Sequence, residues 1–179
     1  SLTLATFSTR FIFPQLSLEG RRFWVIGTAP MKRDHILFGK LALCFVITVG
    51  VSEVLIVISS VMLGTPFPMA VLHSVALLGI CFGLSGLSVG LGCLYPDFSE
   101  DNPSKIVSGF GGTLNLVLSL SFVIVVLVIQ AVPCFLFFGK GVLTAFEFRS
   151  WVLLALGAIA VVSLVTGLIP IQLGLKKIR

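Results

Sequence analysis

Charged residues are scarce in this sequence. Its 179 residues include 7 Asp and Glu and 12 Lys and Arg, which together make up 11% of the chain. A water-soluble domain carries about 25% charged residues, so the composition excludes an ordinary soluble enzyme or binding domain. Hydrophobic residues make up 57% of the chain, and the mean hydropathy is +1.16. These values are typical of integral membrane proteins.

Residues that hold metals or cofactors are also few, with 2 His and 4 Cys in the chain. The cysteines do not follow the spacing of a metal site: Cys44, Cys81, Cys93 and Cys134. We therefore expect small apolar core residues at these positions, and we expect neither a metal nor a cofactor. The phosphate-binding pattern Gly-x-x-x-x-Gly-Lys-Ser/Thr is missing from the sequence, so no nucleotide cradle of that type is predicted here.

Long apolar runs dominate the sequence instead. Four of them cover residues 35–63, 69–94, 106–132 and 150–175. As a helix, each is long enough to cross about 30 Å of hydrocarbon. Lipid requires helices or closed barrels, and the runs do not alternate as barrel strands do. The sequence therefore predicts an all-α, polytopic membrane helix bundle over residues 35–179, with four transmembrane helices plus a short cytoplasmic helix.

The parts outside these runs suggest a longer protein. We expect residues 1–13 to be the cytoplasmic end of an upstream transmembrane helix, followed by a cytoplasmic loop over residues 14–34. Asn102 and Pro103 precede the third run. Asn is a favoured helix N-cap and Pro suits the first helical position, so a helix is predicted to start there.

Basic residues are unevenly distributed between the two sides of the predicted bundle. If each run crosses once, only Lys140 and Arg149 lie on one side, and the other ten of the 12 Lys and Arg lie on the opposite side. Cytoplasmic loops are enriched in Lys and Arg, so the side with ten, which includes the C-terminus, is predicted to be cytoplasmic. Membrane orientation then explains the net charge of +5, and no nucleic-acid partner is expected.

The loop before the first run has the features of a short helix. Ser17 is a suitable N-cap, and Gly27 and Pro30 are suitable terminators. The loop also carries a group of charged and aromatic residues: Glu19, Arg21, Arg22, Phe23 and Trp24. Two interpretations fit this group. It is either an anchor in the lipid headgroup region or a docking element for a cytosolic partner.

Two sets of residues carry a family resemblance. The first set is Phe13-Pro14, Ser17-Leu18-Glu19-Gly20, Phe23-Trp24, Ala29-Pro30 and Lys40. The second set is Gly92, Leu94-Tyr95-Pro96, Phe98, Asn102-Pro103 and Gly111-Gly112. In this order they resemble the first and second cytoplasmic loops of ABC-2 type transporter permeases, and in particular those of the bacterial exporter branch.

This resemblance implies a function. The four runs would be the third to sixth helices of a six-helix permease subunit in the bacterial inner membrane, which exports a substrate and is not itself an enzyme. Residues 17–27 would form the coupling helix, with Glu19 and Arg21 or Arg22 contacting a separate ATP-binding cassette ATPase. A second permease half would complete the path. A non-transporting membrane scaffold or a channel is the alternative interpretation.

A stripe of glycines marks the second apolar run. Gly79, Gly83, Gly86 and Gly90 recur at positions i, i+4, i+7 and i+11 and so share one helix face. Small residues let membrane helices approach closely. We predict a packing seam within the chain; a sliding seam or a contact between two protomers is the functional alternative.

Two ionisable residues fall inside the apolar runs. Glu53 needs a partner or a proton, because an unpaired charge inside lipid costs a few kcal/mol or more. Antiparallel pairing of the first two runs places His73 about one helical turn from the level of Glu53, so His73 is the first candidate partner. The pair is either a structural hydrogen bond or a polar site on a transport path.

One short motif suggests an enzyme. Gly83-Leu84-Ser85-Gly86 matches the Gly-x-Ser-Gly of rhomboid-type intramembrane proteases. That chemistry requires a histidine within hydrogen-bond reach of the serine. His73 lies about 18 Å away on the same predicted helix, and His35 lies at the entrance of the first run. The protease interpretation is therefore disfavoured.

Overall fold

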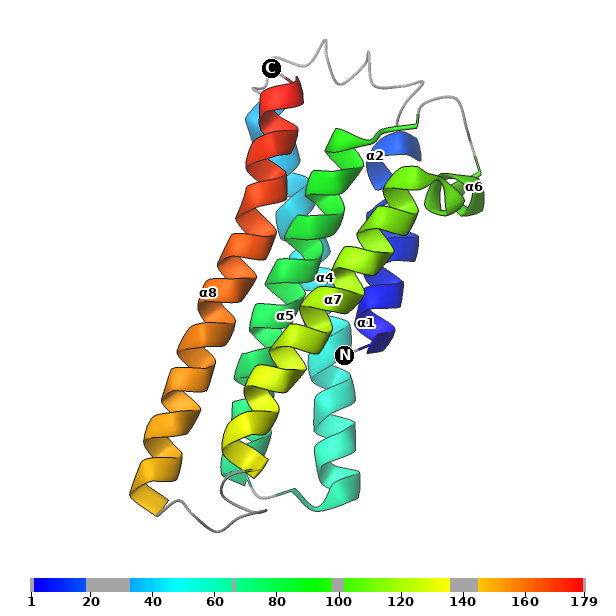
Figure 1. Cartoon of the computed structure of the whole chain (residues 1–179). Helices are drawn as coiled ribbons and strands as arrows, with labels where there is room; N and C mark the ends of the chain where they lie inside the picture. The colour runs from blue at the N-terminus through cyan, green and yellow to red at the C-terminus, as the bar shows by residue number, and fades with distance from the viewer. Residues whose placement is uncertain (1, 19–32, 66, 98–101, 136–144, 179) are drawn as a thin grey trace.

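The computed structural model describes residues 2–18, 33–65, 67–97, 102–135 and 145–178 (Figure 1). All secondary structure in these ranges is helical. The four long helices are α4 (Arg33–Leu63), α5 (Phe67–Leu94), α7 (Phe110–Cys134) and α8 (Ala145–Ile178). The short elements are α1 (Leu2–Phe7), the π-helix η1 (Ser8–Ile12), α2 (Gln15–Leu18) and α6 (Pro103–Ser108).

The long helices contain four segments that are long and apolar enough to cross a membrane. These segments are Phe38–Leu63, Met69–Leu94, Phe110–Val132 and Ser150–Lys176. A helix of 26 residues is about 39 Å long, which exceeds the hydrocarbon thickness of about 30 Å. The predicted all-α membrane bundle with four candidate spanning helices is confirmed.

Helix α5 is the centre of the bundle. In its span 78% of the most apolar window is buried, against 17–33% in the other three spans. It packs against α4, α7 and α8 and also contacts η1. Large apolar side chains on α4 and α8 point outward, for example Val46 and Leu154. This arrangement matches a bundle whose outer surface meets lipid.

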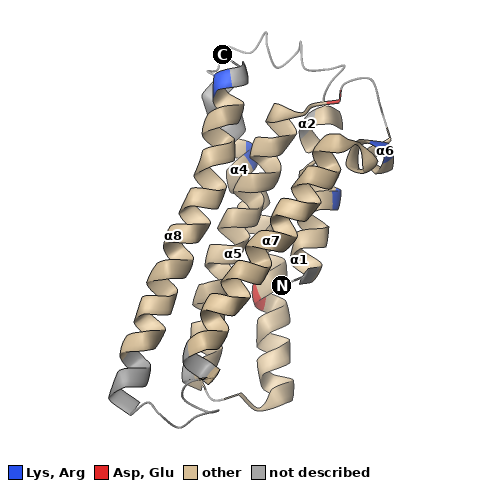
Figure 2. Ribbon diagram, in the orientation of Figure 1, with Lys and Arg blue, Asp and Glu red and all other residues tan. Residues whose placement is uncertain are grey.

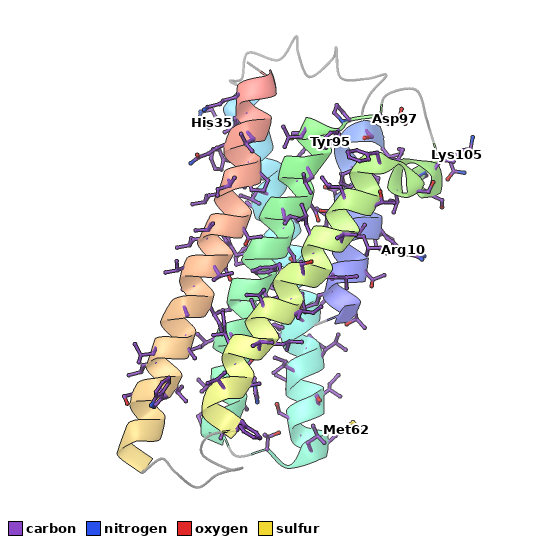
Figure 3. All side chains as sticks on the ribbon, viewed as in Figure 1. Arg10, His35, Met62, Tyr95, Asp97 and Lys105 are labelled. Atoms are coloured by element: carbon purple, nitrogen blue, oxygen red, sulfur yellow. The ribbon has the colours of Figure 1, made fainter. Side chains whose placement is uncertain are left out.

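The bundle has two distinct ends. The one that we name the C-terminal end carries α2, α6 and the C-terminus, and the opposite one, which we name the hairpin end, carries the turn between α4 and α5 (Figure 1). At that turn Gly64 has φ 61°, a left-handed conformation that glycine adopts without strain. Tyr95, Asp97 and Lys105 lie at the C-terminal end and Met62 lies at the hairpin end (Figure 3).

The N-terminal segment packs inside the bundle. Helix α1 starts about midway along the bundle, and α2 lies at the C-terminal end (Figure 1). Ser17 was predicted to be a helix N-cap, but it lies within α2, is buried, and its Oγ accepts a hydrogen bond of 3.1 Å from the backbone N–H of Asp97. The N-cap prediction is wrong because α2 starts earlier, at Gln15. The predicted coupling residues Glu19, Arg21, Arg22, Phe23 and Trp24 lie outside the described residues.

A break separates α6 from α7. Asn102 caps α6 as predicted, because its side chain accepts a 3.0 Å hydrogen bond from the backbone N–H of Ser104. The hydropathy pattern predicts one continuous run from residue 106, but Gly109 has an extended backbone (ψ 174°) and ends α6. Gly112 makes the sharp turn possible, since a Cβ there would lie 2.1 Å from the carbonyl oxygen of Val107. The short helix α6 therefore lies beside the end of α7 (Figure 1).

Basic residues gather toward one end of the described structure. Figure 2 shows the Lys and Arg positions in the half of the bundle that holds the C-terminus. Arg10 and Lys105 are two of them (Figure 3). Among the residues that Figure 2 describes, the rest of the ribbon is almost free of charge, as a segment that crosses hydrocarbon must be.

Candidate functional site

Buried polar side chains form a connected cluster inside the bundle. The polar cluster consists of Ser8 and Thr9 of η1, Ser88 of α5 and Asn115 of α7, all of them at most 1% exposed. The Asn115 Nδ2 amide donates over 3.1 Å to Thr9 Oγ1 and over 3.1 Å to Ser88 Oγ. Ser88 Oγ lies 2.7 Å from Ser8 Oγ, which in turn donates to the carbonyl oxygen of Leu84 over 3.2 Å.

These distances allow two directions of donation, because Ser88 Oγ also lies 3.3 Å from Asn115 Oδ1 and can donate to it when Ser8 donates to Ser88. If Ser8 donates to the Leu84 carbonyl, Ser88 must donate to Ser8, and Ser88 then accepts from Asn115. Every hydroxyl along this chain is satisfied, as buried polar groups require. The polar cluster thus joins η1, α5 and α7 through side chains. Isolated Ser, Thr and Asn residues carry no periodic signal, so the sequence alone does not predict this cluster.

A second polar contact joins α4 to α5. Thr48 Oγ1 lies 3.1 Å from Ser85 Oγ and 2.6 Å from the carbonyl oxygen of Cys44. Ser85 is the serine of the protease-like motif, and its partner in the structure is a threonine hydroxyl. A threonine hydroxyl is no general base at neutral pH. The geometry therefore offers no serine–histidine pair at Ser85.

Glu53 and His73 do not pair with each other. Glu53 Oε2 accepts a 2.5 Å hydrogen bond from Ser74 Oγ. His73 Nδ1 lies 2.6 Å from Gln130 Nε2 on α7. The first-candidate partner is thus corrected from His73 to its neighbour, because consecutive helix residues point about 100° apart. Ser74 faces α4, whereas His73 faces α7.

The second carboxylate oxygen of Glu53, Oε1, does not take part in the hydrogen bond to Ser74. Oε1 is buried and has no hydrogen-bond partner among the described residues. A carboxylate accepts through both oxygens, so this atom can still accept a hydrogen bond or face a cation.

The glycine stripe of α5 faces two neighbouring helices. A Cβ added at Gly79 would lie 3.1 Å from Ser163 Oγ, and one at Gly86 would lie 2.6 Å from the Cα of Gly167. A Cβ at Gly90 would lie 2.5 Å from the backbone of Pro170. These three positions contact α8. Gly83 instead contacts α7, because its Cβ would lie 2.5 Å from the ring of Phe122.

The four glycines therefore form a close seam within this chain. Three of the four are buried, and Gly79 is partly buried. A second protomer has no access to the buried positions, so the contact-between-protomers alternative is not supported by this geometry. The seam holds α8 against the central helix at the short distance that membrane helix packing uses.

The described part of the chain contains no candidate metal-binding site. Within those ranges no group of three or more His, Cys, Asp or Glu side chains could hold an ion. Cys44, Cys81 and Cys93 are free and buried in the apolar core. The described part of the interior offers hydrogen-bonding side chains and the carboxylate of Glu53.

Comparison with known proteins places the chain in a family. A family model described as "Putative ATP-binding cassette" matches residues 1–179. No curated protein and no solved structure matches the chain. The matched family is not the ABC-2 type permease family that the loop motifs resemble, so that assignment is wrong. The predicted ABC-2 exporter permease function and the prediction that the chain is not an enzyme are overturned with it, because the family's description names ATP binding.

The loop motifs led to the wrong family assignment for a physical reason. Pairs such as Phe13-Pro14 and Asn102-Pro103 are helix boundary signals at a membrane surface, and different membrane families use the same signals. The family model instead spans the whole chain, including all four candidate spanning helices. On this match, the chain belongs to the family described as "Putative ATP-binding cassette".

Proposed function

We propose that this chain is an integral membrane component of an ATP-binding cassette transport system. The observation that carries the proposal is the family match over residues 1–179, which contain four helices long and apolar enough to cross a membrane. A family of ATP-binding cassettes works by coupling nucleotide binding to movement. A helix bundle with four such spans is the part that would move within the lipid.

The C-terminal end of the bundle would face the cytosol and the nucleotide. Ten of the 12 Lys and Arg of the sequence support this orientation. Helix α2 ends and α4 begins at this end (Figure 1), so Glu19 and the neighbouring Arg21, Arg22, Phe23 and Trp24 are the proposed contact with the nucleotide-binding part of the system. An ATP-binding cassette ATPase and a second membrane half are the proposed partners, in the bacterial inner membrane.

Hydrogen bonds inside the bundle connect its C-terminal end to the helices α5 and α7. Ser17 of α2 accepts a hydrogen bond from Asp97, just after the central helix α5. A few residues earlier, Ser8 and Thr9 join the polar cluster with Ser88 and Asn115. A displacement at residues 17–27 would therefore act on α5 and α7 through hydrogen bonds and close packing.

The test is ATP hydrolysis in purified material. The full chain is isolated from membranes with all tightly bound proteins, placed in lipid nanodiscs, and assayed for vanadate-sensitive ATPase activity. Photolabelling with azido-ATP then identifies the chain that binds the nucleotide. We expect ATPase activity in this material, and we expect Glu19→Arg to lower it without lowering protein yield.

The matched control is Glu147→Arg, the same substitution in α8 at the hairpin end of the bundle. It should leave the ATPase rate unchanged. Material that neither binds azido-ATP nor hydrolyses ATP would refute membership in an ATP-driven system. An equal ATPase rate in the Glu19→Arg and Glu147→Arg proteins would remove Glu19 from the proposed contact.

A further inference from the structure

A cavity of about 550 Å³ lies between α4 and α5 toward the hairpin end. Its walls are mostly apolar, with Ile56, Val57 and Val71 among them. The polar groups that line it are Glu53, Ser74, Ser60 and Thr65. Binding sites for small molecules have this volume and this combination of apolar walls with a few polar groups.

Glu53 lies deep in the membrane-spanning part of α4. At 1.5 Å per residue it is about 15 Å from Leu63, where the helix ends. Ser74 occupies only Oε2, and Oε1 is buried without a partner among the described residues. Glu53 therefore lines the cavity, and no described side chain neutralises the charge of its carboxylate.

No Lys or Arg of the described residues lines this cavity. The nearest basic residue toward the start of α4 is Lys40, about 20 Å away along the helix. His73 faces α7 and pairs with Gln130. An ionised carboxylate this deep in a membrane costs several kcal/mol unless a cation approaches it or it takes up a proton.

We propose that the Glu53 cavity binds a lipophilic organic cation. The cation would approach the carboxylate of Glu53, and its apolar groups would contact the walls formed by α4 and α5. The depth argues against a lipid headgroup amine, which would have to descend about 15 Å below the membrane surface. The apolar walls argue against a hydrated inorganic ion, which would lose its water without gaining oxygen ligands.

Two probes of the same shape and opposite charge test this proposal. Radiolabelled tetraphenylphosphonium, a cation, and tetraphenylborate, an anion, are equilibrated with the purified chain in phosphatidylcholine nanodiscs, and empty nanodiscs give the blank. We expect saturable binding of the cation only. Glu53→Gln keeps the side-chain shape and the acceptor for Ser74 but removes the charge, and it should weaken cation binding about tenfold or more.

The control for loss of a carboxylate is Asp97→Asn, at the C-terminal end of the bundle and outside the cavity. It should bind the cation as the unmodified protein does. Ala70→Phe fills the cavity while leaving Glu53 unsubstituted, and it should also abolish binding. This second variant tests the proposal even if the Glu53→Gln protein fails to fold. Equal binding of both probes, or unchanged cation binding in either cavity variant, would overturn the proposal.

A further binding measurement distinguishes an organic cation from a lipid amine as the natural occupant of the cavity. If phosphatidylethanolamine nanodiscs abolish tetraphenylphosphonium binding, a lipid amine fills the cavity and the proposal is wrong; unchanged binding there supports it. The measurement uses neither nucleotide nor a partner protein. Its outcome is therefore independent of the ATPase test of the proposed function.

Discussion

Asn115 of α7 donates from one amide nitrogen to two hydroxyls on two other elements, Thr9 of η1 and Ser88 of α5, each over 3.1 Å. An amide NH₂ group carries two hydrogens, so both bonds can form at once. One side chain therefore holds three helical elements together in the buried interior.

Replacing Asn115 with Leu should destabilise the bundle. Leucine has a similar volume, so the change removes the two hydrogen bonds and leaves the hydroxyls of Thr9 and Ser88 short of a donor. The expected loss is about 0.6–3 kcal/mol in the free energy of unfolding, measured by thermal or chemical unfolding in detergent. The control is Ser121→Ala on the same helix, where an exposed hydroxyl bonds only its own helix at Val117. Equal stability of the two variants would show that the polar cluster is not holding the bundle.

The close contact that Gly79, Gly86 and Gly90 of α5 make with α8 should not accommodate an added methyl group. Gly86→Ala places its Cβ 2.6 Å from the Cα of Gly167, which is backbone and cannot turn aside. We expect a clear drop in melting temperature, because the two helices must move apart. Gly50→Ala and Gly157→Ala are matched controls, since nothing lies within 4 Å of the added Cβ at either position. These controls should be neutral or stabilising by up to about 1 kcal/mol; a Gly86→Ala protein as stable as they are would contradict close packing of the seam.

Glu53 and Ser74 should be energetically coupled. Ser74→Ala removes the hydroxyl that donates to Oε2 and leaves the whole carboxyl group without a described hydrogen-bond donor. In a Glu53→Gln background the same change affects a neutral amide, so its cost should be smaller. Hydrogen bonds to charged groups contribute about 1.5–3 kcal/mol, against about 0.5–1.5 for neutral ones. The double-mutant cycle over unfolding free energies measures the difference, and a coupling of zero would mean that the pair contributes nothing to stability.

The contact between α2 and the end of α5 should protect one backbone amide. Ser17 Oγ accepts from the Asp97 N–H over 3.1 Å, so Ser17→Ala should speed hydrogen exchange in the peptide that contains Asp97. Mass spectrometry of exchanged and digested protein measures this rate. Ser108→Ala is the control, because that hydroxyl bonds the Lys105 carbonyl of its own turn. If exchange at Asp97 is the same in all three proteins, the Ser17 bond does not constrain this end of the bundle.

The two ends of the bundle should react differently with a membrane-impermeant maleimide in intact cells. Met62 lies at the hairpin end and is 82% exposed, so Met62→Cys should be labelled from outside. Ser104 is exposed beside Lys105 at the C-terminal end, so Ser104→Cys should be labelled only after the membrane is opened. The unmodified chain, which carries Cys44, Cys81, Cys93 and Cys134, gives the background labelling on each side. The reverse pattern would contradict the proposed orientation.

Much of the fold follows from local properties of the sequence. The four apolar runs become helices because lipid leaves the backbone no other partner, and this depends on composition and length alone. Asn102 caps α6 because its side chain and the Ser104 amide are two residues apart in the chain. The burial cost of Glu53 predicts that it needs a polar partner, whatever the arrangement of the helices. The family, in contrast, came from the match over the whole chain, since short loop motifs are common to unrelated membrane proteins.

Only the tertiary structure decided which groups meet. Ser74 rather than His73 contacts Glu53 because one residue rotates the side chain by about 100° around the helix. Asn115 reaches Thr9 across 106 positions of sequence because α7 and η1 happen to lie side by side. Gly83 contacts α7 although the other three glycines contact α8. Each outcome depends on helix rotation and tilt at the scale of a hydrogen bond, and these are fixed by the packing of all the helices together, whereas the helices themselves are fixed by their own residues.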